Sequence, residues 1–214
     1  MSRINFIGGG QMYQPAMFRE VNQAVLHELI RDFPFATVMV MHSDGVEISH
    51  LPLVLDTTKQ KLIGHIAKAN PLVKILSSAA AAVTVIFNGE HGYISPSYYL
   101  QPEQNVPTWN YAVVHALGVI SLISDENKLM EILDHLQSLY DVTTTDWSNP
   151  KMSNKLKGIS GFEINIRELQ GKFKLSQNKE TDEQKHLVQQ LAKSNSTSDV
   201  KLAEFMQNYL SLES

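Results

Sequence analysis

The chain has 214 residues, of which 43% are hydrophobic and 19% are charged, and it contains no cysteine. This composition excludes disordered, collagen-like and disulfide-stabilised chains, and the missing thiols exclude zinc and iron–sulfur sites built on cysteine. The formal net charge of -4 argues against a constitutive nucleic-acid binder, because phosphate neutralisation needs clustered lysine and arginine.

The first third of the chain predicts a leader, a helix and three strands. Residues 1–11 include three consecutive glycines and are expected to form a flexible leader. Apolar residues at helical spacing predict a helix over about 21–31, which Pro34 ends. Asp44-Gly45 is typical of a hairpin turn. The strands are expected over residues 35–41, 46–55 and 61–66.

The rest of the chain predicts further strands and four helices. Asn70 before Pro71 is typical of a helix start, and this short helix should end near Ser78. Thr181 and Gln184 form a capping-box pattern for the first of two C-terminal helices. Further helices are expected over 125–140, 181–193 and 199–210, and further strands over 82–87, 112–123, 162–166 and 173–175.

This order of elements indicates an α+β fold. The strands follow one another at hairpin length without a regular alternation with helices, so a doubly wound parallel sheet is not expected. We expect one antiparallel β-barrel with peripheral helices and a C-terminal helical appendage. Because no signal peptide and no apolar run of about 18 residues is visible, we also expect a soluble cytoplasmic protein without a membrane partner.

The turn after the third predicted strand is a candidate phosphate site. His65 ends the strand, Lys68 follows it, and Asn70 begins the next helix. A helix N-terminus offers free backbone N–H groups and a positive dipole end, and a lysine adds a full charge. The alternative is a plain strand-to-helix turn whose lysine is solvated.

Two loop-like segments, 91–99 and 106–111, are rich in aromatic, hydroxyl and amide side chains. The second segment contains Trp109, Asn110 and Tyr111. Aromatic faces stack on planar ligands, while amides and hydroxyls bind the polar rims of such ligands. The two segments therefore predict either a planar-ligand site or structured turns anchored by buried aromatic residues.

The segment 171–178 alternates basic and apolar residues before a polar end. Lys172 and Lys174 should share one face of a strand, with apolar side chains on the other face. Ser176 and Gln177 place hydrogen-bond donors at the end of this strand. An anionic ligand or a subunit partner would suit the basic face, and the alternative is an amphipathic edge strand protected by its lysines.

Four histidines in or beside predicted strands could converge on a metal: His50, His65, His91 and His115. None belongs to a metal-binding helix motif, so four separate pocket or core histidines are the better interpretation. Glu163 alternates with apolar neighbours and is expected to be solvated rather than catalytic. The two C-terminal helices mix lysines with carboxylates and present no basic recognition face.

Seven segments spread over the chain carry a family resemblance. They are Met12-Tyr13-Gln14-Pro15 with Phe18, Pro34-Phe35-Ala36-Thr37, His50-Leu51-Pro52-Leu53, Gly64 to Pro71, Tyr93-Ile94-Ser95-Pro96-Ser97, Val106 to Tyr111 with Val114-His115, and Gly171 to Asn178. Each motif alone is modest, but together and in this order they resemble the PaiB family of FMN-binding negative transcriptional regulators.

The resemblance implies a split β-barrel, like that of the pyridoxamine-phosphate-oxidase-like flavoproteins, over residues 12–180. It implies that the helices of residues 181–214 pack on the same domain. It also implies a homodimer that binds FMN in clefts at the subunit interface. Related barrels hold the flavin phosphate near the strand–helix turn, here at Lys68 to Asn70. Family members usually have arginine at position 68, and Lys68 lacks the bidentate fork of an arginine.

Ten residues are predicted to bind FMN, and no catalytic residue or metal ligand is proposed. Three turn residues should contact the phosphate or ribityl chain, three should face the flavin ring, and four should contribute from the last strand. In that order they are His65, Lys68 and Asn70; Trp109, Asn110 and Tyr111; and Lys172, Lys174, Ser176 and Gln177.

Three functions remain open at this point. The family resemblance favours an FMN-binding negative regulator. The first alternative is a flavin-dependent oxidoreductase on the same barrel, where the protein binds and orients the cofactor. The second is a non-flavin ligand-binding or histidine–metal module. DNA is a possible partner that the charge pattern does not support, so regulation could also act through another protein.

Overall fold

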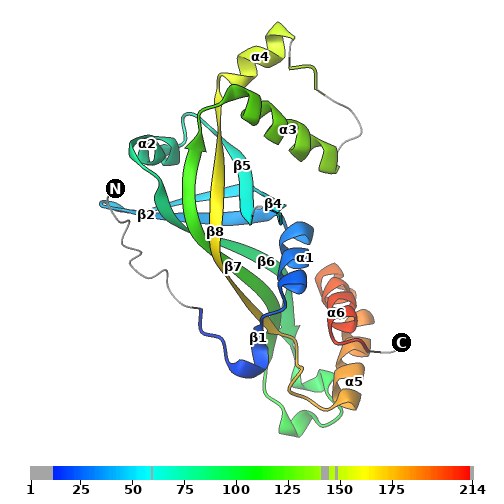
Figure 1. Ribbon diagram of the computed structural model, residues 1–214. Helices are drawn as coiled ribbons and strands as arrows, with labels where there is room; N and C mark the ends of the chain where they lie inside the picture. Colours follow the sequence, from blue (N-terminus) through cyan, green and yellow to red (C-terminus); the bar gives the residue numbers. More distant parts are fainter. Residues whose placement is uncertain (1–11, 59, 141–144, 148, 213–214) are drawn as a thin grey trace. The chain divides into compact units, whose positions relative to one another are not determined.

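The computed structural model describes residues 12–58, 60–140, 145–147 and 149–212, shown as a ribbon in Figure 1. In these residues eight strands form one antiparallel sheet in the order β3-β2-β6-β7-β8-β5-β4, with β1 paired to β8. The strands are β1 (Arg19–Glu20), β2 (Phe35–His42), β3 (Gly45–Pro52), β4 (Val54–Asp56), β5 (Lys61–Ala67), β6 (Ala81–Ile94), β7 (Thr108–Ile123) and β8 (Ile159–Lys174).

Six α-helices accompany the sheet in the described residues, and short 3₁₀ turns connect some of the strands. The helices are α1 (Gln23–Asp32), α2 (Pro71–Ser78), α3 (Glu126–Tyr140), α4 (Pro150–Leu156), α5 (Thr181–Ala192) and α6 (Thr197–Tyr209). The 3₁₀ turns are η1 (Ala16–Phe18), η2 (Pro96–Tyr98) and η3 (Pro102–Gln104). None of these helices has the length and apolar content that crossing a lipid bilayer requires.

The described residues divide into two compact units. Unit 1 comprises residues 27–87 and 115–169, and unit 2 comprises residues 12–26, 88–114 and 170–212, apart from the positions left undescribed. The three long strands β6, β7 and β8 contribute residues to both units. The expected division into a leader, a barrel domain and C-terminal helices stays a prediction, and the leader lies outside the described residues.

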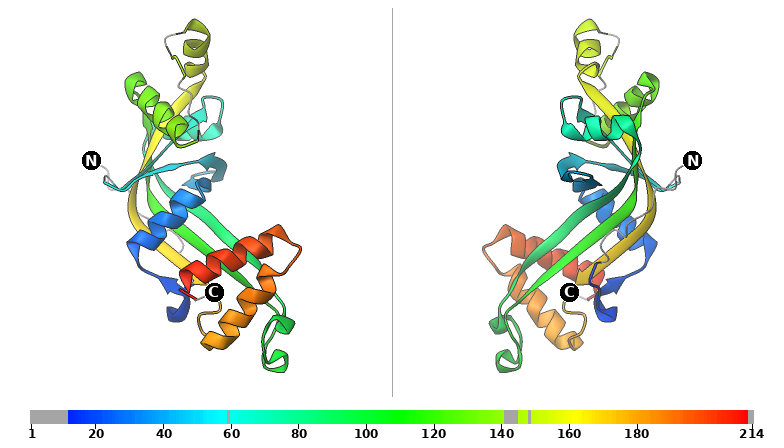
Figure 2. Two further views of the ribbon diagram at one scale, coloured as in Figure 1. Left: turned by 90° about the vertical axis from the view of Figure 1, so that its right-hand side faces the viewer. Right: turned by 90° about the vertical axis from the view of Figure 1, so that its left-hand side faces the viewer.

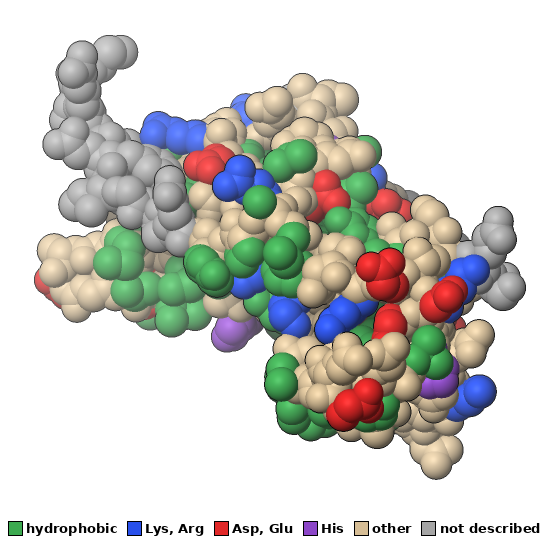
Figure 3. Space-filling model, turned by 90° about the horizontal axis from the view of Figure 1, so that it is seen from below, with side chains coloured by type: hydrophobic (Ala, Val, Ile, Leu, Met, Phe, Trp, Pro, Cys, Tyr) green, Lys and Arg blue, Asp and Glu red, His purple; other side chains and the backbone are tan. Residues whose placement is uncertain are grey.

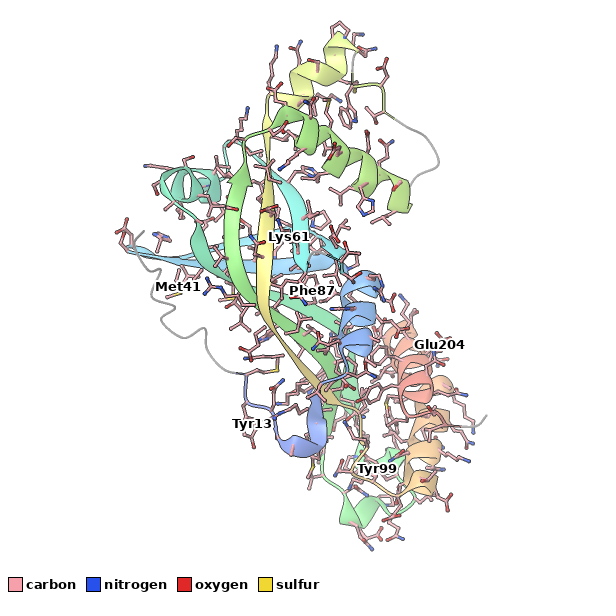
Figure 4. All side chains as sticks on the ribbon, viewed as in Figure 1. Tyr13, Met41, Lys61, Phe87, Tyr99 and Glu204 are labelled. Carbon is pink, nitrogen blue, oxygen red and sulfur yellow. The ribbon has the colours of Figure 1, made fainter. Side chains whose placement is uncertain are left out.

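Unit 1 is built around the inward faces of β2 and β5, on which every second residue is buried. Phe87 at the end of this unit's part of β6 is fully buried and is labelled in Figure 4. Gly64 on β5 has no room for a side chain, because an added Cβ would lie 2.7 Å from Phe162 and 2.8 Å from Leu53. The opposite face of β5 packs with α3 in a second apolar cluster around Ile132.

Unit 2 buries the apolar faces of α5 and α6, which lie against each other in both views of Figure 2. Phe173 on β8 is buried and packs against the ring of Tyr209, 5.0 Å between centroids. Gly171 lets β1 and the start of α1 approach β8, because a Cβ there would clash with Leu26. The hydroxyl of Tyr209 donates to Glu20 Oε2 at 2.7 Å and so fastens β1 to α6.

The main features predicted from the sequence are confirmed. The fold is an antiparallel α+β split barrel with peripheral helices, and the strands over 35–41 and 61–66 are present as β2 and β5. The predicted hairpin between β2 and β3 is present, but its two turn residues are Ser43 and Asp44, one residue earlier than predicted, because Gly45 already pairs with His42. The helix expected over 125–140 is α3, and the side chain of Asp125 accepts from Asn127 N at 2.9 Å near its start.

Several predicted strand ends are wrong. β6 continues to Ile94, β7 already begins at Thr108, and β8 spans both strands expected between 162 and 175. The interpretation of residues 91–94 and 108–111 as loop is therefore also wrong. Polar and aromatic side chains suggested ends at these positions, but on an exposed sheet face the backbone ladder continues whatever the side chains are.

The predicted capping box of α5 is also wrong. Glu180 is the N-cap, Thr181 is already helical, and the amide of Gln184 donates to Lys179 O at 2.6 Å. Helix α4 was not expected, since it is a single short helix without a clear apolar stripe. Helix α6 begins two residues earlier than predicted because Ser196 caps it, accepting from Asp199 N at 3.4 Å.

Candidate functional site

The turn between β5 and α2 in unit 1 forms as predicted. Asn70 is the N-cap of α2, and its Oδ1 accepts from Leu72 N at 2.8 Å. The Nδ2 of Asn70 donates to Oγ of Ser49 at 3.1 Å, and Ser49 is a buried residue of β3. The N–H of Asn70 donates to Ala67 O at 2.9 Å and closes the turn. Asn70 thus fixes where the helix begins and how the turn lies against β3.

The free backbone N–H groups expected at the start of α2 are not available. Pro71 has no N–H, Leu72 N is taken by the cap, and Val73 N donates to Asn70 O at 3.0 Å. An anion at this turn therefore depends on the side chain of Lys68 rather than on the helix terminus. The expectation of a helix-terminal anion site is wrong in this respect, because the cap satisfies the groups that an anion would need.

Lys68 is exposed, and its ammonium group makes no hydrogen bond or ion pair with the described residues. Its backbone N–H donates to Gly158 O at 2.8 Å, which ties the turn to the end of α4. Lys68 lines a hollow of about 620 Å³ with Lys157, Ser77 and Ser160, but Asp125 and Glu126 line it too. The ammonium and hydroxyl donors suit a phosphate, whereas the two carboxylates oppose an anion in the same hollow.

His65 lies on β5, half-buried, three residues before Lys68. Its Nδ1 is buried and has no hydrogen-bond partner among the described residues. Burial also lowers the pKa of His65, so that the neutral imidazole is favoured. A buried ring nitrogen without a partner is costly, and a hydroxyl or phosphate oxygen of a bound ligand would satisfy it.

Unit 2 presents aromatic rings along β6 and β7. Trp109 is 54% exposed, and its ring lies 6.5 Å from that of His91 at an interplanar angle of 29°. The ring of Tyr93 meets Trp109 edge-on at 6.2 Å. His91, Trp109 and Tyr111 line a hollow of about 540 Å³ with backbone and small residues of the same strands. An exposed aromatic surface of this kind suits the face of a planar ring.

The basic residues of β8 lie beside these aromatic residues. The ammonium group of Lys172 lies 5.1 Å from the ring centre of Tyr13 and 5.4 Å from that of Tyr111. Lys174 Nζ donates to Thr108 Oγ1 and to the backbone oxygen of Trp109, both at 2.7 Å. The edge-strand interpretation of this segment is wrong, because β8 pairs with β7, β5 and β1.

Three predicted site residues are used inside the fold of unit 2. Asn110 is fully buried and donates to Ser176 Oγ at 2.9 Å, while Tyr99 OH lies 3.0 Å from the same oxygen. Gln177 folds back on its own strand, accepting from Leu175 N at 2.8 Å and donating to a backbone oxygen. To contact FMN, these groups would have to give up their present partners.

The ten predicted residues therefore fall into two groups. His65, Lys68 and Asn70 belong to unit 1, and the other seven belong to unit 2. That both groups contact one FMN molecule stays a prediction. Tyr13 and Tyr99 were not predicted as site residues, because nothing local in the sequence signals that each contacts a lysine far away in the chain.

Metal binding gains no support from the described residues, among which no group of three or more His, Asp or Glu is arranged to hold an ion. His50 Nδ1 lies 3.1 Å from Thr37 Oγ1 and the ring stacks near Phe35. Glu163 accepts from Lys61 Nζ at 2.8 Å in a half-buried ion pair, so its carboxylate is paired rather than freely solvated as expected.

Solved structures of other proteins share the split-barrel fold of this chain. The FAD and heme binding protein from Mycobacterium smegmatis has a TM-score of 0.55 and 15% identity, and the match covers 78% of each chain. The flavocytochrome Anf3 from Azotobacter vinelandii has a TM-score of 0.55 and 19% identity, over 73% of this chain and 69% of that one. At such identities the likeness shows the fold alone.

The family is shown by sequence. Residues 12–168 match the family described as "Putative FMN-binding domain". The protein "Protease synthase and sporulation protein PAI 2" from Bacillus subtilis (strain 168) is 31% identical over 207 residues, covering 93% of this chain and 98% of that protein. The chain belongs to this PaiB-type FMN-binding family, as the sequence motifs indicated, and FMN is its cofactor.

Proposed function

We propose that this protein is a cytoplasmic, homodimeric FMN-binding regulator of the PaiB type that acts negatively on transcription, directly or through a partner protein. The observation that carries the proposal is the alignment with the Bacillus subtilis protein, which covers 98% of that protein's length. The name of that protein refers to protease synthase and sporulation. This match covers 93% of the chain and so extends beyond residues 12–168 of the family match, which means that the shared function need not be that of the barrel alone.

In this proposal Lys68 binds the FMN phosphate. Its free, exposed ammonium group beside serine hydroxyls fits a phosphate dianion, and Asn70 holds the turn that presents it. The unpartnered Nδ1 of His65 fits a ribityl or phosphate oxygen. Trp109 and Tyr111 offer faces for a flavin ring. Bound FMN supplies electron-transfer chemistry, and the protein supplies binding and orientation.

Cofactor titration with Lys68→Ala tests this assignment. Loss of one charge-assisted contact should weaken FMN binding by about tenfold or more, since such a contact contributes roughly 1.5–3 kcal/mol. FMN dissociation constants would be measured by flavin fluorescence quenching. Lys74→Ala, an exposed lysine on α2, is the matched control and should bind FMN as the wild type does. An unchanged constant for Lys68→Ala removes this residue from the site.

An exposed apolar surface on the β2–β3 hairpin supports the homodimer. Phe35, Met41, Val46 and Ile48 are exposed by 42% or more, and the register sets Met41 opposite Val46 on one face. Figure 3 shows hydrophobic side chains gathered over this hairpin, and Figure 4 labels Met41 on it. Apolar patches of this kind typically mark an interaction surface.

The oligomeric state tests this surface directly. Ile48→Lys should convert a dimer to a monomer at micromolar concentration, because it places a charge in the apolar contact. Light scattering during size-exclusion chromatography measures the mass. Val21→Lys, at an exposed apolar position of unit 2, is the control that should leave the mass unchanged. A monomeric wild-type protein would refute the homodimer.

Direct and indirect regulation are separated by DNA selection. The net charge of -4 and the mixed charges of α5 and α6 favour indirect regulation. We expect no enrichment when purified, FMN-loaded protein selects from a pool of genomic fragments at 150 mM salt. Reproducible enrichment of one fragment class, lost at higher salt, would establish direct DNA binding instead.

A flavin-dependent oxidoreductase is the alternative, and the hollow of about 540 Å³ beside Trp109 favours it, because it has room for a planar substrate. Anaerobic mixing of FMN-loaded protein with NADH or NADPH tests it. Bleaching of the flavin absorbance within seconds, followed by reoxidation with turnover, would support an enzyme. A flavin that stays oxidised for minutes would support the regulator.

A further inference from the structure

Three lysines of unit 2 lie close together without an acidic partner. Lys172, Lys174 and Lys179 are half-buried, and none forms an ion pair with a carboxylate among the described residues. We call these three residues the lysine cluster. Lysines are almost never fully buried without pairing, and three partly buried lysines without a carboxylate partner also leave positive charge uncompensated.

Neutral groups hold each ammonium group in place. Lys172 lies between the rings of Tyr13 and Tyr111. Lys174 donates to Thr108 Oγ1 and to a backbone oxygen. Lys179 donates to an asparagine side chain at 2.6 Å and lies 5.3 Å from the ring centre of Tyr99. Aromatic faces and neutral oxygens orient a cation but leave its charge uncompensated.

The positive charges of Lys172 and Lys179 repel that of Lys174. Burial, and then the charges of Lys172 and Lys179, lower the pKa of Lys174, and no carboxylate opposes this shift. Two acidic groups of the same unit are used elsewhere: Glu20 accepts from Tyr209 OH and Glu183 from Leu100 N at 2.8 Å. A group of partly buried cations without a carboxylate partner is typical of a site that a ligand completes.

We propose that the lysine cluster binds the phosphate or carboxylate group of a small planar ligand other than FMN, an effector or a substrate. The ring of Tyr13, which is 80% exposed and lies 5.1 Å from the ammonium group of Lys172, would take the ring of this ligand. The proposal rests on the proposed function, which assigns the single phosphate of FMN to Lys68, and it replaces the sequence-based prediction that Lys172 and Lys174 bind FMN. The ligand class is therefore a second anion, recognised in unit 2.

A small anion is favoured over a nucleic acid backbone. Only three lysines make up the cluster, and they are held in fixed positions by aromatic and hydroxyl neighbours. The net charge of -4 disfavours contact with an extended polyanion beyond the cluster. A single phosphate or carboxylate, by contrast, fits the few donors present.

Calorimetric titration of FMN-saturated protein with phenyl phosphate tests the proposal, with phenol as the neutral probe and inorganic phosphate as the ringless one. We expect binding of phenyl phosphate and none of phenol. Lys172→Gln and Lys174→Met should each weaken binding by at least about tenfold, as loss of a charged contact does. Lys201→Ala, an exposed lysine of α6, should not change it.

Two further readouts make the outcome decisive. FMN affinity should stay within about twofold in both variants, and a parallel fall of FMN affinity would instead assign the cluster to FMN and overturn the proposal. The pKa of Lys174, followed by NMR, should rise when phenyl phosphate binds, since an anion favours the ammonium form.

Repeating the titration with the Lys68→Ala variant separates this proposal from the assignment of the FMN phosphate to Lys68. Phenyl phosphate should still bind to the lysine cluster of this variant. Lys172→Arg keeps the charge and should retain binding, which controls for misfolding of Lys172→Gln. Absence of phenyl phosphate binding to the wild type, or unchanged binding in both cluster variants, would overturn the proposal.

Discussion

Unit 1 and unit 2 each present lysine to a possible anion, but in different ways. Lys68 stands alone on a turn, exposed and without a partner for its ammonium group among the described residues. Lys174 is half-buried and hydrogen-bonded to two oxygens, and its pKa is lowered by burial and then by the charges of Lys172 and Lys179. The first arrangement costs little in the free protein, whereas the second keeps three partly buried cations without a carboxylate partner among the described residues.

The difference shows that a lysine in a sequence motif does not by itself reveal its role. In unit 1 the fold satisfies the backbone at the helix start and leaves the side chain free. In unit 2 it uses the amides and hydroxyls of the motif internally, at Asn110 and Ser176, and leaves three charges uncompensated. The polar residues of the unit 2 motifs, such as Asn110 and Ser176, therefore serve the structure more than Lys68 in the unit 1 turn does.

The largest effect should come from Asn110→Ala. It leaves Ser176 and Tyr99 with an unfilled cavity in a buried network, and such losses cost about 2–4 kcal/mol. Urea unfolding followed by circular dichroism measures the free energy of unfolding. Asn208→Ala, at an exposed position of α6, is the control. If Asn110→Ala lost FMN affinity without losing stability, Asn110 would be a ligand contact rather than a structural residue.

Asn70→Ala should have an intermediate effect. Loss of the cap of α2 costs about 1 kcal/mol, within the usual range of 0.5–2 kcal/mol for N-caps. Asn70→Asp keeps the cap acceptor and should restore most of this stability, while it adds a negative charge beside Lys68 and should weaken FMN binding. Equal FMN affinity for both variants would contradict a phosphate at this turn.

Lys68→Arg should have a smaller effect, and it should strengthen FMN binding rather than weaken it. The planar guanidinium makes bidentate contacts with phosphate, so FMN binding should tighten by about threefold relative to Lys68. Fluorescence titration at two salt concentrations measures it, because a phosphate contact weakens with salt. Weaker FMN binding by the arginine variant would mean that Lys68 is enclosed by a site too small for the larger group.

The smallest expected effect concerns pH. Burial lowers the pKa of His65, so the unfolded chain binds a proton more readily than the folded one below about pH 6.5. The free energy of unfolding should therefore fall as the pH falls from about 6.5, and His65→Gln should reduce this slope. His27 and His115 have the same direction of shift and should keep part of the slope in the variant. An unchanged slope would show that His65 is freely protonated in the folded protein.

Much of the fold was readable from local patterns. Three local structures follow from such patterns and are left in place by tertiary contacts: the cap at Asn70, the hairpin turn just before Gly45, and helix α3 with its apolar stripe. Strand ends were less predictable, since β6, β7 and β8 run on through residues with polar or aromatic side chains. Their pairing depends on neighbouring strands rather than on their own composition.

The sequence by itself determined the family, the cofactor and the class of fold, because order-preserving motifs and hydrophobic periodicity are local properties of the chain. Only the tertiary structure decided which polar groups are free. Asn110, Ser176 and Gln177 look like ligand contacts in the sequence, yet long-range packing brings them partners within the fold. The lysine cluster and its contacts with Tyr13 and Tyr99 form only when distant segments of the chain fold together. Local sequence patterns therefore do not predict that these positive charges lie near one another.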